Sequence, residues 1–334
     1  MLEITPLYAG QMRTLNVAYT YDGILKDNIH YRTVGGAVES FAFGRYGESP
    51  TFGLGSDVKG VLNVPIPNSY LDIQFAGAAS SYAPGAFVES VTKGDIADKL
   101  GLHIDYWSPV DRRPSMKDSL FCDGGSYENI LLPSMLQRRV QKIVLFFNDH
   151  QPLQPASVWN VAEDEPSASQ VTDSLSSLFG IFPADATDAT WEKRSFDNRK
   201  NQFFSQSDWV SVATGLQQAQ EAGNGIVFTA RLVTVNNDWW GVPAGIESEI
   251  TFVYLGRLKN WEANLSEEMR SLLVPTDATD ASNLAIDVDE GPFRGFPHYF
   301  TAGGLENTER ANVLSDLTGW TILKNADLFK AIFA

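Results

Sequence analysis

The sequence predicts an α/β fold from three observations. Segments with helical spacing of apolar residues alternate along the chain with short apolar runs of strand length, which is the pattern that α/β domains produce. Residues 140–147 form a nearly continuous apolar run, as expected for a strand covered on both faces. Hydrophobic residues make up 43 % of the 334-residue chain, which is enough to bury a sizeable core.

The N-terminal part of the chain predicts few regular elements. Residues 1–90 combine glycine-rich turns with short apolar segments, and residues 90–102 are compatible with a helix. The polar stretch 105–117 contains prolines and predicts a loop. That loop leads into a short apolar strand, which ends just before Asp123.

The remaining elements follow from periodicity and from the residues that end each run. Prolines 152 and 155 end the strand at 140–147, and the Gly223-Asn224-Gly225 stretch ends an amphipathic helix. In chain order the predicted elements are helix 130–139, strand 140–147, helix 207–222, strands 226–235 and 247–254, and helices 259–273 and 308–320. The last helix is expected to pack on the core.

Asp123 is the strongest candidate for a catalytic residue. It follows a short apolar strand and precedes Gly124 and Gly125, and two adjacent glycines allow a turn that a β-carbon would obstruct. Such a turn places the carboxylate at the carboxyl end of a strand, where open α/β sheets keep their sites. A carboxylate there can act as a base for a nucleophile supplied from elsewhere. A capping aspartate in a tight turn explains the same three residues without any chemistry.

A longer segment, from Cys122 to Asn148, carries a family resemblance. It contains Asp-Gly-Gly, Glu128-Asn129, a Leu-Pro pair and then a buried strand, and it resembles the catalytic-aspartate segment of the cytosolic phospholipase A2 and fungal lysophospholipase family, within the patatin-like superfamily. Further segments resemble that family in the same order along the chain. They are residues 2–8, 35–44, 75–81, 241–245, 296–299 and 311–320.

The resemblance implies both a fold and an activity. The implied fold is α/β with a central, mostly parallel sheet and flanking helices, and residues 1–334 would form the C-terminal part of the catalytic domain, incomplete without upstream sequence. The implied activity is acyl-ester hydrolysis of a phospholipid or lysophospholipid at a membrane or micelle surface, by a Ser–Asp dyad that needs no cofactor or metal. Asp123 would be the base, Gly124 and Gly125 would shape the loop, and Asn129 would brace it.

The nucleophilic serine of that family has no counterpart in this chain. Its elbow needs small residues on both sides, because the strained turn packs tightly, and no serine of the chain has glycines two positions before and two positions after it. Ser126 has Gly124 before it but Glu128 after it. We therefore expect the serine on an upstream segment. A late start or a fragment, a split enzyme with a partner chain, and a catalytically inactive lipid-binding or regulatory relative all remain open.

Composition excludes some partners and leaves the compartment open. The formal net charge of −16 argues against nucleic acid, whose phosphates require clustered Lys and Arg, and against electrostatic docking to anionic leaflets. A single cysteine, Cys122, excludes a disulfide within the chain. No signal-like N-terminus and no apolar run near ~20 residues is present in this chain, so localisation is unknown.

Other sites are less favoured by their residue spacing. No convincing nucleophile motif lies beside any histidine, and no His or Cys pair has zinc-ligand spacing; the histidines are His30, His103, His150 and His298. The acidic repeats at 184–190 and 276–281 lack the glycine and the terminal Glu of a calcium loop. Core packing is favoured over a lipid-facing surface for Trp239, Trp240 and Trp261.

Overall fold

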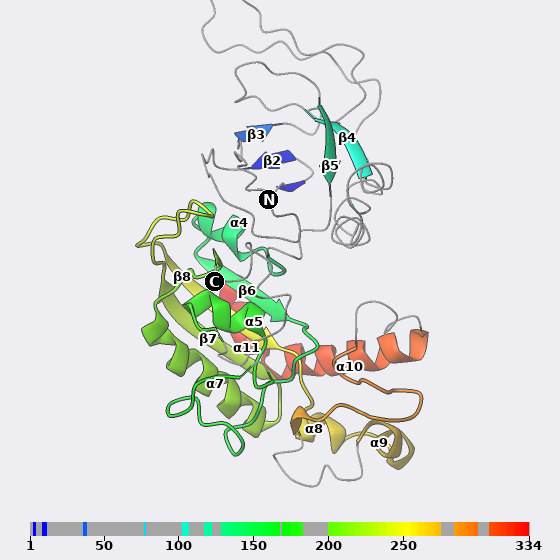
Figure 1. Ribbon diagram of the computed structural model, residues 1–334. Coiled ribbons are helices and arrows are strands. Elements are labelled where there is room, and N and C mark those ends of the chain that lie inside the picture. The colour runs from blue at the N-terminus through cyan, green and yellow to red at the C-terminus, as the bar shows by residue number, and fades with distance from the viewer. Residues whose placement is uncertain are drawn as a thin grey trace, which may run out of the picture. The chain divides into compact units, whose positions relative to one another are not determined.

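The computed structural model describes residues 128–167, 169–182, 200–274, 284–299 and 307–333, together with Gly77 and five short strands that lie before residue 122 (Figure 1). The chain divides into two compact units. One comprises Met1–Asn129 with Lys193–Ser195, and the other comprises Ile130–Glu192 with Phe196–Ala334. Composition does not change at this division, so the structure alone locates it.

The described strands of the first unit are all paired antiparallel. A three-stranded sheet contains β1 (Glu3–Ile4), β2 (Ala9–Gln11) and β3 (Gly36–Val38), and a separate pair contains β4 (Leu102–Tyr106) and β5 (Lys117–Phe121). Strand β5 confirms the strand predicted just before Asp123.

Strand β4 corrects the prediction of a helix ending at residue 102 and a loop starting at residue 105. Apolar and polar residues alternate through Leu102–Tyr106, which is the period of a half-buried strand. The pairing with β5 extends this strand to Tyr106, which lies opposite Lys117. The polar character of the following residues concealed the strand. The rest of the predicted helix lies outside the described residues.

The second unit is built on a three-stranded mixed sheet. Its order is β6 (Lys142–Phe147), β8 (Glu247–Tyr254) and β7 (Ile226–Val233). Strand β6 runs parallel to β8, whereas β7 runs antiparallel to β8. The α/β class is therefore correct, and all three strands lie where the sequence predicts them. Among the described strands, however, β6 and β8 form the only parallel pair.

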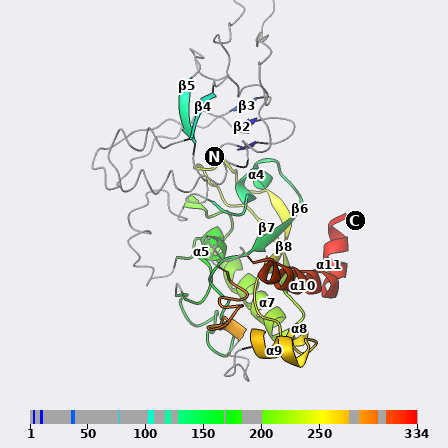
Figure 2. The ribbon, with the colours of Figure 1, turned by 90° about the vertical axis from the view of Figure 1, so that its right-hand side faces the viewer.

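Helices lie on both faces of this sheet (Figures 1 and 2). On one side are α5 (Asp173–Ser176), η3 (Ser177–Phe179), η5 (Gln206–Asp208) and α7 (Trp209–Ala222). On the other are α10 (Thr308–Lys324), α11 (Ala326–Lys330) and η7 (Ala331–Phe333), where the Lys142 ammonium donates to the Ala331 carbonyl at 2.6 Å. Helix α4 (Leu132–Gln137) precedes β6, as predicted.

Aromatic side chains fill the space between the sheet and the α5–α7 layer. The Phe147 ring stacks on the rings of Phe252 and Tyr254, with centroids 6.2 and 6.1 Å apart. The Phe179 ring of η3 contacts two further rings, Phe252 of β8 and Trp209 of α7. These large rings are almost completely buried, so the hydrophobic effect stabilises this layer strongly.

Gly215 of α7 lies where helix and sheet come closest. A β-carbon added there would lie 2.4 Å from the Phe228 ring, whereas one added at Gly319 of α10 would meet nothing within 4 Å. We expect Gly215→Ala to lower the free energy of unfolding by about 1–2 kcal/mol through overpacking. We expect Gly319→Ala to raise it by about 0.5–1 kcal/mol because alanine favours the helix. Urea unfolding measures both, and equal effects would contradict this difference in packing.

The prediction of one continuous helix at 259–273 is wrong. It divides into α8 (Lys259–Glu262) and α9 (Glu267–Leu273). The Ser266 hydroxyl accepts a hydrogen bond from the Met269 amide and caps the second helix. Serine favours caps over helix interiors because its hydroxyl competes for backbone groups, and this local bond starts a new helix.

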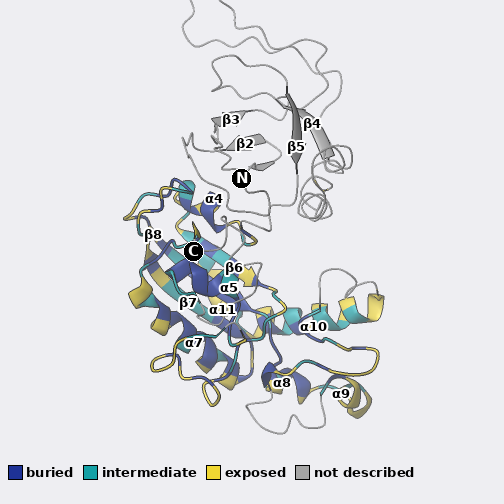
Figure 3. Cartoon of the chain, in the orientation of Figure 1, coloured by how far each residue is buried: buried dark blue, intermediate teal, exposed yellow. Residues whose placement is uncertain are grey.

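Helix α10 extends one turn beyond the predicted end at residue 320 and contacts the core over a small part of its surface. Leu317 and Thr321 are its buried residues, and the Trp261 indole of α8 donates to the Asp316 carboxylate at 2.8 Å. Figure 3 shows the remaining turns as partly or fully exposed. Trp240 and Trp261 are both buried, which confirms core packing for these two tryptophans.

Candidate functional site at the carboxyl ends of strands β6 and β8

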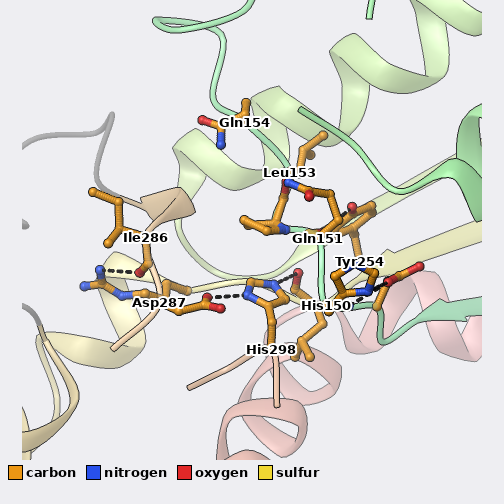
Figure 4. Close-up of polar contacts among 12 residues, drawn as sticks. His150, Gln151, Leu153, Gln154, Tyr254, Ile286, Asp287 and His298 are labelled. Atoms are coloured by element: carbon orange, nitrogen blue, oxygen red, sulfur yellow. Dashed lines mark hydrogen bonds and ion pairs between the residues drawn. The ribbon is translucent and has the colours of Figure 1, made fainter. Parts of the chain in front are cut away.

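The parallel pair β6 and β8 brings polar residues to one edge of the sheet. Phe147 and Tyr254 end the two strands as register partners. The chain continues through Asp149 and His150 after β6, and through Leu255 and Arg257 after β8. Carboxyl ends of parallel strands are where α/β proteins place their sites, so this edge is the candidate site among the described residues (Figure 4).

Asp149 joins the end of β6 to the start of α5. Its Oδ1 lies 2.6 Å from Nδ1 of His150, and its Oδ2 accepts a hydrogen bond from the Thr172 hydroxyl. The same hydroxyl accepts a bond from the Ser174 amide and caps α5. One carboxylate therefore holds two loops together.

The contacts of Asp149 change two pKa values. Burial alone would raise the pKa of Asp149, but hydrogen bonds from His150 and Thr172 outweigh that effect and lower it from 3.8 to about 2. The hydrogen bond to Asp149 raises the pKa of His150 above 6.5 against the opposing effect of burial, and the charges of Asp173 and Asp287 act in the same direction.

Tyr254 connects the same loops from β8. Its hydroxyl donates to the Gln151 carbonyl at 2.7 Å and accepts a bond from the Thr172 amide at 3.0 Å. Burial raises the pKa of this phenol far above its usual value, so it stays neutral and acts as a hydrogen-bonding strut. Its position at the end of β8 lets one side chain order the segments after β6 and before α5.

A second polar group lies on the segment 284–299. His298 is fully buried, with Nδ1 2.6 Å from Oδ1 of Asp287 and Nε2 3.1 Å from the Leu255 carbonyl oxygen (Figure 4). The buried Arg257 guanidinium forms a two-bond pair with Glu262 and also donates to the Ile286 carbonyl at 3.2 Å. The segment is therefore attached to the end of β8 at two neighbouring points.

The residues predicted from the sequence are only partly within the described structure. Asp123, Gly124 and Gly125 lie outside the described residues, so the structure does not place the predicted catalytic carboxylate. Asn129 is exposed, and Glu128 beside it is buried. Of the histidines with described side chains, His150 is exposed and His298 is buried.

The cluster around Asp149 and His298 was not predicted from the sequence. Its members come from four segments that are separated by up to about half of the chain. Only His298 lies in a segment that resembles the phospholipase family, residues 296–299, and that resemblance does not point to Asp149, Thr172 or Tyr254. The one available signal was the Asp149-His150 pair directly after a predicted strand, at the position where α/β sheets place functional groups.

The contacts of this cluster indicate a structural role, in which the side chains hold loops in position, and not a catalytic role. Thr172 and Asp149 have the contacts of a hydroxyl and its base, but Thr172 is 1 % exposed and its oxygen already caps α5. A carboxylate with a pKa near 2 is also a weak base at neutral pH. Within the described ranges, no group of three or more His, Cys, Asp or Glu side chains could hold a metal ion.

The Asp149 contacts predict a bell-shaped contribution to stability. The folded state lowers the pKa of Asp149, so ionised Asp149 stabilises the fold above pH 3.8, and this stabilisation is lost as the pH falls towards 2. The folded state raises the pKa of His150, so protonated His150 stabilises the fold below pH 6.5, and this stabilisation is lost as the pH rises through the folded-state pKa. We expect Asp149→Asn to cost about 2 kcal/mol between these limits, measured by urea unfolding across pH. His150→Gln should remove the loss on the alkaline side and also reduce the loss on the acid side, because His150 helps to lower the pKa of Asp149. Parallel curves for wild type and Asp149→Asn would contradict both assignments.

Comparisons with known proteins do not assign the chain to a family. No protein-family model, no curated protein and no solved structure matches it. In the described part of the chain, no helix is long and apolar enough to cross a bilayer.

Proposed function

We propose that the protein hydrolyses an acyl ester of a phospholipid or lysophospholipid, with Asp123 as the base of a Ser–Asp dyad. The observation that carries this proposal is the order of the segments that resemble the phospholipase A2 and lysophospholipase family, from residues 2–8 to residues 311–320. Each segment is short, and their shared order along most of the chain is the argument.

The described elements on either side of Asp123 occur in the predicted order along the chain. Strand β5 ends at Phe121, two residues before Asp123, and helix α4 begins at Leu132, followed by the buried strand β6. The order of strand, glycines and helix along the chain agrees with the prediction, and adjacent glycines permit a tight turn. Strand β5 pairs antiparallel with β4 in the first unit, however, and is not a strand of the β6–β8–β7 sheet. The patatin-like class and a mostly parallel sheet remain parts of the proposal.

In the proposed reaction, Asp123 takes the proton of a serine hydroxyl as that oxygen attacks the ester carbonyl. The carboxylic acid then returns the proton to the leaving alcohol, which leaves an acyl-serine that water hydrolyses with the same carboxylate as base. The serine has to come from an upstream segment or from another chain, because no serine among these 334 residues has the flanking glycines of an elbow.

The test uses the product of the complete reading frame that contains this sequence. It is incubated with phosphatidylcholine vesicles and with lysophosphatidylcholine micelles, and fatty acid release is measured. We expect release from at least one substrate, and a Gly-x-Ser-Gly-Gly type elbow encoded in frame before Met1. A closed frame without an elbow, together with no release, would overturn hydrolysis by this protein alone.

The missing elbow favours a second candidate function, that of a catalytically inactive lipid-binding or regulatory relative. Such a protein would keep the fold and lose the nucleophile. A split enzyme differs from it because a partner chain would restore the serine. Sedimentation with phosphatidylcholine vesicles without fatty acid release supports lipid binding. Release that appears only after addition of a serine-bearing partner supports the split enzyme.

A further inference from the structure

Strand β6 lies at one edge of the sheet of the second unit. In the part of the chain that the structure describes, it pairs with β8 on one side and with no strand on the other. The Leu255 amide donates to the Phe147 carbonyl at 2.9 Å, so the backbone groups of Phe147 point towards β8. Successive residues of a strand direct these groups to opposite sides. Lys142, Val144 and Phe146 therefore direct their N–H and C=O groups away from β8, along the unpaired edge.

Apolar surface lies beside this edge. Side chains alternate between the two faces of a strand, and Lys142, Val144 and Phe146 share the face on which the Lys142 ammonium binds the Ala331 carbonyl of η7. Val144 is half-buried, Phe146 is 43 % exposed, and Phe333 of η7 is 91 % exposed. An open strand edge with apolar side chains is a template for pairing with another strand.

The unpaired edge is self-complementary. In an antiparallel pair of two β6 strands with a two-fold axis at Val144, Val144 meets its own counterpart, and Lys142 lies opposite Phe146 of the second copy. Residues that face each other in this way exchange two hydrogen bonds, so all the outward N–H and C=O groups of these residues gain partners. We propose that β6 is the interface of a homodimer, in which the sheets of two copies join into one continuous sheet.

The side chains of this pairing are also complementary. Opposing residues of an antiparallel pair place their side chains on the same face, so the Phe146 ring of one copy lies beside Lys142 of the other. The alkyl stem of a lysine covers apolar surface, and its ammonium is attracted to an aromatic ring. Because the Lys142 ammonium is bound to η7, the same ring approaches the helix that carries the exposed Phe333. A second copy supplies these contacts twice, by symmetry.

The first test is sedimentation velocity of the 334-residue chain from about 1 to about 100 µM, the range that detects a micromolar dimer. High salt is used because the net charge of −16 on each copy causes a repulsion that salt screens. We expect a monomer–dimer equilibrium. Hydrogen exchange then locates the interface. Protection of the Val144 amide should rise about tenfold or more in the dimer, whereas that of the Leu145 amide, which points towards β8, should stay high in both states.

Three variants test the register. Phe146→Lys places like charges opposite each other at two symmetric positions, and it should raise the dissociation constant of the dimer about tenfold or more. The double variant Lys142→Glu/Phe146→Lys places opposite charges there and should recover most of this loss. The control is Val233→Lys on β7, where the side chain is 51 % exposed, and it should leave the dissociation constant unchanged.

Several results would overturn the proposal. They are a monomer at every concentration, open-ended assemblies in place of a dimer, a dimer in which the Val144 amide stays unprotected, and a dimer of unchanged strength in Phe146→Lys. A double variant that associates no better than Phe146→Lys alone would overturn the antiparallel register. The sedimentation and exchange measurements on the wild type need no variant to fold.

Discussion

In the proposed Ser–Asp mechanism, replacing Asp123 by Asn is expected to lower kcat for acyl-ester hydrolysis about 10²–10⁴-fold in the product of the complete reading frame, which is the usual contribution of a general base. The amide has nearly the shape of the carboxylate and cannot accept the serine proton. KM should change little, since in the proposed mechanism Asp123 transfers a proton and does not bind the acyl chain. Initial rates with phosphatidylcholine or lysophosphatidylcholine over a range of concentrations separate the two constants.

The matched control for Asp123→Asn is Asp327→Asn. Asp327 is fully exposed on α11, and its ion pair with Lys330 is long, at 3.7 Å. Its replacement removes the same charge from a surface position, so kcat should stay within about twofold of the wild type, as for surface changes of small energetic effect. Comparable losses in the two variants, or full activity in Asp123→Asn, would remove Asp123 from the proposed dyad.

Replacing Arg257 by Ala is expected to lower the free energy of unfolding by about 3–5 kcal/mol, the cost of breaking a buried ion pair. The guanidinium is 1 % exposed and donates to both carboxylate oxygens of Glu262, at 2.7 and 3.0 Å. Alanine leaves that carboxylate buried without its counter-ion. It also removes the hydrogen bond to the Ile286 carbonyl, which attaches residues 284–299. Urea unfolding at neutral pH measures the loss.

The matched control for this prediction is Arg231→Ala. Arg231 pairs with Glu249 across β7 and β8 at 3.3 Å, but its side chain is 76 % exposed. An exposed pair contributes about 0–1 kcal/mol because water and salt screen it. If both substitutions cost the same, burial does not determine the strength of the Arg257–Glu262 pair, and our interpretation of the β8–α8 connection is wrong.

Elements with a strong local period could be predicted from the sequence. Helix α7 and strands β6, β7 and β8 lie within a few residues of their predicted positions. In each case the spacing of apolar residues predicts the element, and a nearby glycine or proline predicts where it ends. Both signals depend on a few consecutive residues only. The glycine after α7 is an example, since Gly223 adopts φ +75° and ends the helix.

Elements that depend on a partner could not be predicted in this way. Strand β4 forms opposite β5, and the break between α8 and α9 depends on the side-chain cap of Ser266. The direction of β7 relative to β8 was also unknown, because strand direction depends on connections and packing and leaves no periodic signal. The mixed character of the sheet is thus a property of the tertiary structure.

The sequence by itself determined the α/β class, the main elements of the second unit, and Asp123 as a candidate residue with a family resemblance behind it. Only the tertiary structure decided which polar groups meet at the ends of β6 and β8. Asp149 contacts Thr172, and His298 contacts Leu255 43 positions away. Such contacts arise when strands and loops pack in space, and a pattern read along neighbouring residues contains no record of them.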